Sequence, residues 1–251
     1  MNKVLVAFAL KEEFAPWRRR HGFRRVASPS HPVSVGSFGS TEVYVALVGA
    51  GAPDAGHFEG LTTQFKPSLG IVTGVAAGLR PEWRPGDLLV AHSVTGPGGE
   101  AAIPSPAHLI DSAVRAGARP ATLVTLPRIA RTHEEKASLA ALADAADMES
   151  LPLMKQWSTL GIPSLALRVI LDPVEMPMTV DFESAMDAHG QVQIAKILAQ
   201  LGRRPHLLPD FIRLARQSRR TLKILAQFLD RFFEELERST ADSSSPPAPQ
   251  S

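Results

Sequence analysis

The chain has 251 residues, 44% of them hydrophobic and 21% charged, and its 27 Lys and Arg against 25 Asp and Glu give a net charge of +2. These values are typical of a folded globular protein and argue against a nucleic-acid-binding protein, which needs clustered Lys and Arg. The absence of cysteine excludes disulfides, cysteine-bound metals and a thiol nucleophile. No apolar run reaches the roughly 20 residues that span a bilayer, so we expect a cytoplasmic protein without a signal peptide.

Apolar runs and amphipathic segments alternate over the first 172 residues. Residues 4–10 form a continuous apolar run, which is typical of a strand buried on both faces, and a helix is expected over Glu12–Arg20. Residues 95–108 are rich in Gly, Pro and Ala and predict a loop. Further strands are expected at 33–35, 43–48, 69–73, 88–93, 121–126 and 163–171, and further helices at 53–65, 109–116, 133–144 and 147–160.

Beyond residue 172 the strand pattern stops. Residues 181–200 and 207–238 read as helices, and residues 239–251 form a polar segment rich in Ser and Pro that predicts disorder. The alternation predicts an α/β fold, a three-layer αβα arrangement with a central mixed, largely parallel sheet. We expect an α/β domain over 1–180, a C-terminal helical extension of that domain over 181–238, and a disordered tail over 239–251.

Three carboxylates occupy positions where open α/β sheets bind ligands, beyond the carboxyl ends of strands. Asp172 follows the strand 163–171, Glu13 follows the first strand, and Glu149 begins a helix. A carboxyl group buried in a cleft has a raised pKa and can act as a general acid near neutral pH. The alternative is a structural role at a helix start, as a cap or as a partner of the helix dipole, and position alone favours the cap for Asp172.

Two glycine-containing segments also follow strands. Gly49-Ala50-Gly51 and residues 74–78 would let the backbone approach a ligand closely. Neither segment matches the phosphate-binding P-loop or the dinucleotide-binding G-x-G-x-x-G pattern. The eight His are scattered without the spacing of a metal site, so we predict no metal.

Four segments, in this order along residues 3–175, together resemble the nucleoside phosphorylase/nucleosidase family, which includes purine nucleoside phosphorylases and methylthioadenosine/S-adenosylhomocysteine nucleosidases. They are Ala9–Phe14, Thr73–Leu79 with Arg84–Asp87, Asp147–Ser150 and Arg168–Asp172. A narrower and less specific similarity is to hopanoid-associated phosphorylases, which release adenine from adenosylhopane. It is carried by Gln193–Leu198, Arg203–Pro205 and Leu208–Arg216.

The resemblance implies a role for each candidate residue. Asp172 would protonate or hydrogen-bond N7 of the purine, Glu149 would hold the ribose hydroxyls, and Met148 would pack on the sugar. Glu13 matches the carboxylate that activates the attacking water in the nucleosidases. The implied enzyme cleaves the N-glycosidic bond of a 5′-substituted adenosine and needs no cofactor. Further substrate contacts are implied for Gly49, Gly74, Val75 and Ala76.

The chain departs from the family pattern at three positions. Leu171 stands where the family usually has Ser, Val75 where several nucleosidases have Ser, and Ala77 where Gly is frequent. These departures leave open whether water or phosphate is the nucleophile, with Lys11 or one of Arg18–Arg20 as candidate partners of a phosphate. They also leave two alternative functions: a methylthioadenosine/S-adenosylhomocysteine nucleosidase, and a non-catalytic binder of purine nucleosides.

The C-terminal segment combines a basic stretch with an apolar helical stripe. Residues 203–223 hold seven Lys and Arg against one Asp, and the stripe consists of Leu222, Leu225, Leu229, Phe232 and Leu236. One interpretation is a helix packed on the sheet with a solvated basic face. A second is an interfacial helix over 207–238 that contacts the inner membrane and extracts a lipid-linked nucleoside. A third is a helix pair in a homodimer. Without an aromatic platform, nucleic-acid binding is not expected.

Overall fold

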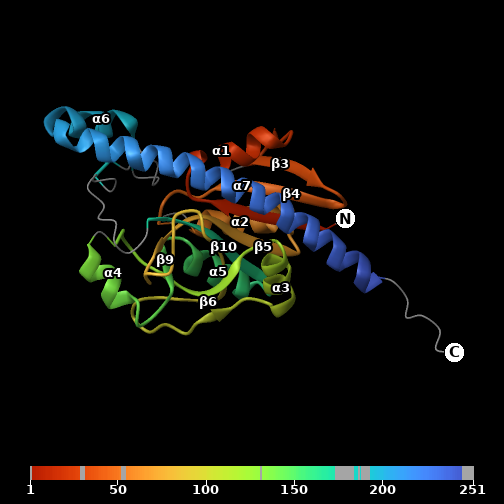
Figure 1. The fold of residues 1–251 in the computed structure, drawn as a ribbon. Helices are drawn as coiled ribbons and strands as arrows, with labels where there is room; N and C mark the ends of the chain where they lie inside the picture. The colour runs from red at the N-terminus through yellow and green to blue at the C-terminus, as the bar shows by residue number, and fades with distance from the viewer. Residues whose placement is uncertain are drawn as a thin grey trace.

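The computed structural model describes residues 2–28, 32–51, 55–130, 132–172, 184, 185, 187 and 193–244 (Figure 1). Its strands are β1 Lys3–Phe8, β2 Arg24–Val26, β3 Val33–Phe38, β4 Thr41–Leu47, β5 Leu69–Gly78, β6 Leu88–Thr95, β7 Ile103–Pro104, β8 Arg119–Thr125, β9 Ala145–Asp147 and β10 Ser164–Asp172. Its α-helices are α1 Lys11–Arg20, α2 Ala55–Phe65, α3 Ala107–Arg115, α4 His133–Leu139, α5 Ser150–Thr159, α6 Ile194–Arg203 and α7 Leu208–Ser244.

The strands form one mixed sheet in the order β10-β6-β8-β9-β5-β1-β4-β3-β2, with β7 on β6. Strand β5 also pairs with β10, so β5, β10, β6, β8 and β9 close into a ring. Parallel pairs join β1 to β4 and β5, and β5 to β10, while β10–β6 and β5–β9 are antiparallel. Because β1, β5 and β10 run in parallel, their carboxyl ends meet at one edge of the sheet.

Helices cover both faces of the sheet, as the α/β prediction required (Figure 1). Alternate residues of β1 point to opposite faces: Val4, Val6 and Phe8 pack with side chains of α1, α3 and α7. Leu5 and Ala7 belong to the second cluster, which holds buried residues of α2 and α5. The three layers predicted from the apolar runs are therefore present.

Several element boundaries differ from those expected. Strand β5 continues through Gly78, so the glycine-containing segment 74–78 belongs to the strand instead of following it. The helix expected over 147–160 begins only at Ser150, because Ala145–Asp147 pair as a strand with β5 and β8. Helix α4 ends at Leu139, five residues earlier than expected. Short strands β2 and β7 were not predicted at all.

Helix α7 spans 37 residues and crosses one face of the sheet (Figure 1). It continues to Ser244, so residues 239–244, which were expected to be disordered, are helical; residues 245–251 lie outside the described part. Of the helix expected over 181–200, nine residues also lie outside the described part, and α6 begins at Ile194. Among the described residues, no helix is both long and apolar enough to span a membrane.

Candidate active site

A pocket of about 360 Å³ opens at the edge where β1, β5 and β10 end. All three predicted carboxylates, Glu13, Glu149 and Asp172, line this pocket, although they lie up to 159 positions apart in sequence. Each is almost fully buried, with 5%, 6% and 5% of its surface exposed. Other lining residues include Leu10, Val75, Ala76, Ala77, Leu126, Met148 and Leu171.

Glu13 lies in the first turn of α1 and is held by the ends of two strands. Its Oε2 accepts a hydrogen bond of 3.1 Å from the backbone N–H of Leu10, just after β1. Its Oε1 accepts one of 3.0 Å from the N–H of Val75 in β5. Burial raises the pKa of the Glu13 carboxyl, against the opposing effects of the Arg168 charge and these N–H groups. The carboxyl group is therefore fixed in place, and its carboxylate form is a stronger base than that of an exposed glutamate.

Gly74 allows this approach. Its φ of +153° and the absence of a side chain are both needed, since a Cβ there would lie 2.6 Å from Glu13 Oε1 and 2.8 Å from Arg168 Nη1. Gly74 itself is not among the lining residues, in contrast to Val75, Ala76 and Ala77. Gly74 was expected to let the backbone approach a ligand. It instead leaves room for the side chains of Glu13 and Arg168 to approach the strand.

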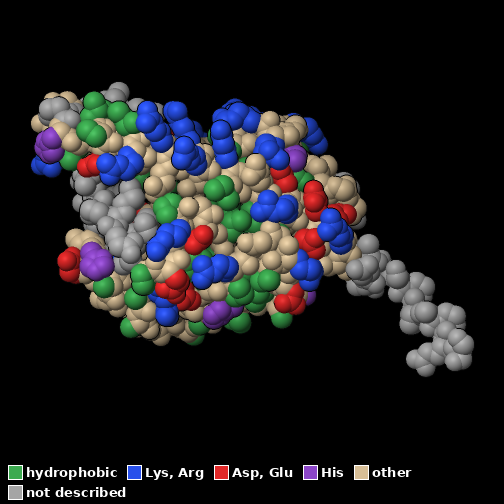
Figure 2. Space-filling model, in the orientation of Figure 1, with side chains coloured by type: hydrophobic (Ala, Val, Ile, Leu, Met, Phe, Trp, Pro, Cys, Tyr) green, Lys and Arg blue, Asp and Glu red, His purple; other side chains and the backbone are tan. Residues whose placement is uncertain are grey.

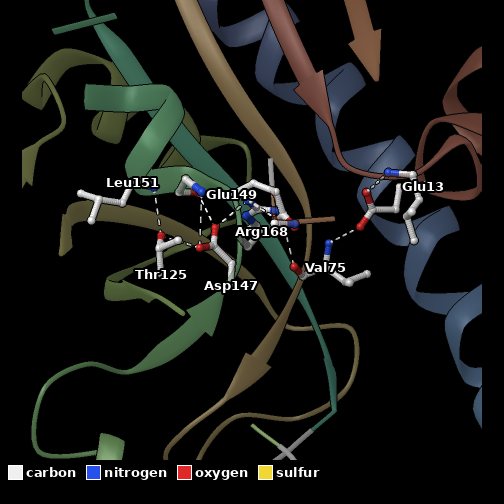
Figure 3. Close-up of polar contacts among 10 residues, drawn as sticks. Glu13, Val75, Thr125, Asp147, Glu149, Leu151 and Arg168 are labelled. Atoms are coloured by element: carbon white, nitrogen blue, oxygen red, sulfur yellow. Dashed lines mark hydrogen bonds and ion pairs between the residues drawn. The ribbon is translucent and has the colours of Figure 1, made fainter. Parts of the chain in front are cut away.

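Arg168 stands at the centre of the polar network behind the pocket (Figure 3). Its side chain is fully buried, and Nη2 lies 2.6 Å from Asp147 Oδ2 and 3.3 Å from Glu149 Oε2. Asp147 is held further by the hydroxyls of Thr125, at 2.6 Å, and Ser150. A buried cation needs such partners, because desolvation of an unpaired charge costs several kcal/mol. Arg168 thereby fixes the carboxyl group of Glu149.

Glu149 occupies the N-cap position of α5 but makes no capping hydrogen bond. Its Oε1 instead accepts a 3.0 Å hydrogen bond from the backbone N–H of Gly51, across the pocket from α5. Burial raises the pKa of Glu149 to about 7; Arg168 opposes the rise, whereas Asp147 and Glu13 add to it. The alternative predicted for Glu149 was an interaction with the dipole of its helix; the carboxyl group contacts Gly51 and Arg168 rather than the first N–H groups of α5.

Asp172 ends β10 and contacts a lysine that the sequence had not singled out. Lys136 of α4 has no exposed surface, and its Nζ lies 2.8 Å from Asp172 Oδ2. Burial raises the pKa of Asp172 to about 6, and the lysine charge limits that rise. A carboxyl group with this pKa holds and releases a proton close to neutral pH, as a general acid must.

One wall of the pocket is apolar and comes from α7. It consists of Phe211, Leu214, Ala215, Ser218 and Leu222. The Nε2 of Gln217 donates a hydrogen bond to the backbone oxygen of Leu171, which ties this part of α7 to the end of β10. The pocket therefore has a carboxylate-lined end on the sheet and an apolar side on the helix.

A family model described as the phosphorylase superfamily matches residues 3–202 of this chain. The chain belongs to the phosphorylase superfamily. This membership agrees with the resemblance found in the sequence, and it makes the carboxylate-lined pocket the candidate active site of a nucleoside phosphorylase or nucleosidase. The search of curated proteins gives no match.

Solved structures of the same fold cover almost the whole chain. A 5′-methylthioadenosine/S-adenosyl homocysteine nucleosidase of Campylobacter jejuni has a TM-score of 0.71 at 17% identity, with 94% of this chain and 99% of that chain covered. A mutant futalosine hydrolase of Helicobacter pylori gives 0.68 at 16%, covering 94% and 100%. A putative methylthioadenosine nucleosidase of Weissella paramesenteroides gives 0.69 at 19%, covering 94% and 98%. At these identities the likeness shows a shared fold.

The remaining predicted residues divide into two groups. Met148, half-buried, lines the pocket as expected, next to Glu149. Gly49 does not line the pocket, and Ala50 does so in its place. The backbone of Gly49 has a φ of +77°, and its N–H donates a hydrogen bond to the backbone oxygen of Ala9. The cations considered as phosphate partners, Lys11 and Arg18–Arg20, are exposed on α1 and do not line the pocket.

Sequence reasoning assigned no role to three residues of this superfamily site. Arg168 carried a usable signal, because a lone charge inside the apolar run 163–171 must find buried partners. Asp147 could have been linked to it through the neighbouring Glu149. Lys136 has no such signal in the sequence, because it lies in a polar helix and contacts Asp172 only in the folded chain.

Proposed function

We propose that this chain cleaves the N-glycosidic bond of a 5′-substituted adenosine and releases adenine. The observation that carries the proposal is the convergence of three buried carboxyl groups, Glu13, Glu149 and Asp172, on one pocket. Glycosidic cleavage through an oxocarbenium-like transition state needs a proton for the leaving group and negative charge near the sugar. A pocket with these groups at different proton affinities supplies both.

In this proposal each carboxyl group has one task. Asp172, with its pKa near 6, donates a proton to the purine as the bond from C1′ to N9 breaks. Glu149 accepts hydrogen bonds from the ribose hydroxyls, and its charge stabilises the sugar cation. Glu13 takes a proton from the water that attacks C1′. Met148 packs on the sugar.

The surroundings of Glu13 favour water over phosphate as the nucleophile. Its carboxyl group already engages the N–H of Val75, a backbone donor that an anion in this position would need. The negative charge of the Glu13 carboxylate would also repel a phosphate ion bound at close range. We therefore place hydrolysis ahead of phosphorolysis.

The apolar wall of α7 supports a substrate with an apolar 5′ group. Phe211, Leu214 and Leu222 offer hydrocarbon surface beside the carboxylate-lined end of the pocket. Adenosylhopane, a nucleoside with a long hydrocarbon 5′ substituent, is the substrate we place first. Methylthioadenosine, with a small apolar 5′ group, is the alternative substrate.

Adenine release tests the proposal. The enzyme is incubated with methylthioadenosine or with an adenosine that carries a long 5′-alkyl chain, each with and without phosphate, and adenine is measured by chromatography. We expect release from the long-chain substrate without phosphate. Asp172→Asn should reduce release about 100-fold or more, because an amide cannot supply the proton, whereas Asp111→Asn on the exposed face of α3 should leave release unchanged.

Each other outcome changes one part of the proposal. Dependence on phosphate would overturn hydrolysis and make the enzyme a phosphorylase. Fast release from methylthioadenosine alone would overturn the long-chain substrate. Tight binding of either nucleoside without any release would leave a non-catalytic nucleoside binder.

We propose that the membrane contact of α7 is confined to its N-terminal part. The stripe expected to enter a bilayer is buried against the sheet instead: Leu222, Leu225, Leu229 and Phe232 are at most 6% exposed. The seven Lys and Arg of residues 203–223 are all exposed, next to exposed Leu208 and Ile212. Figure 2 shows Lys and Arg side chains gathered along the edge where α7 lies. Such a surface suits anionic headgroups near the pocket's apolar wall.

A further inference from the structure

Lys136 is a fully buried ammonium group that lies behind the pocket. It is not a lining residue, and the contact through which it reaches the site is the 2.8 Å hydrogen bond from Nζ to Asp172 Oδ2. Burying a lysine is costly unless a paired acid offsets the loss of hydration. A hydrophobic side chain at position 136 would avoid this desolvation cost. We therefore expect the buried charge of Lys136 to have a function.

A capping box and an ion pair hold the first turn of α4, which carries Lys136, in place. The Thr132 hydroxyl accepts a 3.1 Å hydrogen bond from the N–H of Glu135, and the two residues form a capping box that starts α4. The Glu135 carboxylate also pairs with Arg128 at 2.6 Å, on the rim of the pocket. The ammonium group of Lys136 is therefore presented to Asp172 from a fixed helix start.

We propose that Lys136 is a positioning residue that holds one carboxyl oxygen of Asp172 from behind, so that the other oxygen serves the purine. The inference rests on the proposed function, in which Asp172 is the acid. When the bond from C1′ to N9 breaks, its electron pair moves to the purine, and the purine takes the proton of Asp172. The carboxylate that remains lies against the Lys136 ammonium, which stabilises it. Lys136 thus favours the state formed during the reaction.

The charges around Asp172 point to Lys136 as the group that sets its acidity. Burial raises the pKa of Asp172, and the lysine charge is the main opposing influence. Among the described charged groups near the pocket, Arg168 pairs with Asp147 and Glu149, and Arg128 pairs with Glu135. Glu12 pairs with Lys11, and Glu13 accepts hydrogen bonds from backbone N–H groups. Removing the lysine charge should therefore raise the pKa of Asp172 above 6 and make it a weaker acid.

Kinetics of Lys136→Met test this role. Asp172 holds its proton to higher pH in this variant, so the alkaline limb of kcat/KM should move to higher pH. We expect kcat to fall by about tenfold or more, with KM changed by less than about threefold, because the contact acts on the transition state. Lys136→Arg keeps the charge and should restore the wild-type limb. Lys155→Met, on the exposed face of α5, is the matched control.

A double-mutant cycle separates positioning from a general structural effect. In the Asp172→Asn background, Lys136→Met should cause no further loss of residual activity, because Lys136 acts through Asp172. A further loss of tenfold, or an unchanged alkaline limb in Lys136→Met alone, would overturn the proposal. Thermal unfolding of each variant verifies that the compared proteins are folded.

A direct titration keeps this inference separate from the proposed reaction. Carboxyl ¹³C NMR of the full chain, assigned with Asp172→Asn, should show the Asp172 titration moving to higher pH in Lys136→Met. If it moves while no nucleoside releases adenine, the link between Lys136 and Asp172 stands and the proposed reaction fails. If it does not move, Lys136 has no influence on the acid and the inference fails, whatever the activity.

Discussion

Glu149→Gln should flatten the dependence of stability on pH. Glu149 is 6% exposed, and its pKa of about 7 in the folded chain lies above its ordinary value of 4.5. Below pH 4.5 the carboxyl is protonated in both the folded and the unfolded chain. As the pH rises towards 7, the unfolded chain loses this proton first, and the free energy of unfolding falls.

The magnitude follows from the two pKa values. The difference of about 2.5 between 4.5 and 7, at 1.36 kcal/mol per pKa unit, corresponds to about 3 kcal/mol in full. About 2–3 kcal/mol of this falls between pH 5 and pH 8. A glutamine does not titrate, so the wild-type chain should lose about that much more stability across this range than Glu149→Gln does.

Urea denaturation at pH 5 and pH 8, followed by circular dichroism, measures this difference. Comparing each protein with itself at the two pH values removes the pH-independent cost of the substitution, such as the lost charge opposite Arg168. Glu234→Gln on the exposed side of α7 is the matched control. Equal losses in wild type and Glu149→Gln would refute the conclusion that burial holds the proton on Glu149.

Two further predictions concern the glycine at the end of β5 and the basic surface. Gly74→Ala should cost about 1–3 kcal/mol of stability and most of the activity, because a Cβ would collide with Glu13 and Arg168. Gly60→Ala, where a Cβ meets nothing within 4 Å, should cost neither, as thermal unfolding and adenine release would show. Replacing Arg216 and Arg219 by Glu should reduce co-sedimentation with anionic liposomes and leave neutral liposomes unaffected; unchanged co-sedimentation would contradict a basic membrane surface.

Much of the layered architecture follows from local patterns. Residues Val4–Phe8 of the apolar run 4–10 form a strand buried on both faces, and their side chains alternate between two apolar layers. Boundaries were less predictable where pairing partners decide them. Asp147 was expected to begin a helix, and it ends strand β9 instead, because β9 pairs with β5 and β8 on either side.

What the apolar stripe of α7 packs against could likewise not be predicted from local sequence patterns. Its apolar stripe and basic face are visible in the sequence, but a stripe of this kind fits a sheet, a membrane or a second helix equally well. The packing of Phe228, Phe232 and Phe233 against the sheet settles the place of that stripe. The helix also runs past residue 239, where a polar composition had suggested disorder.

The sequence by itself determined which acids could act, because Glu13, Glu149 and Asp172 stand at strand and helix ends, where a fold of this class binds its ligands. Tertiary structure alone decided what those acids can do. Burial raises their proton affinity, Arg168 and Lys136 oppose it, and Gly74 makes room for the contacts. The physical reason is that a pKa depends on charges and solvent within a few ångströms, and residues as distant in sequence as 136 and 172 become neighbours only in the folded chain.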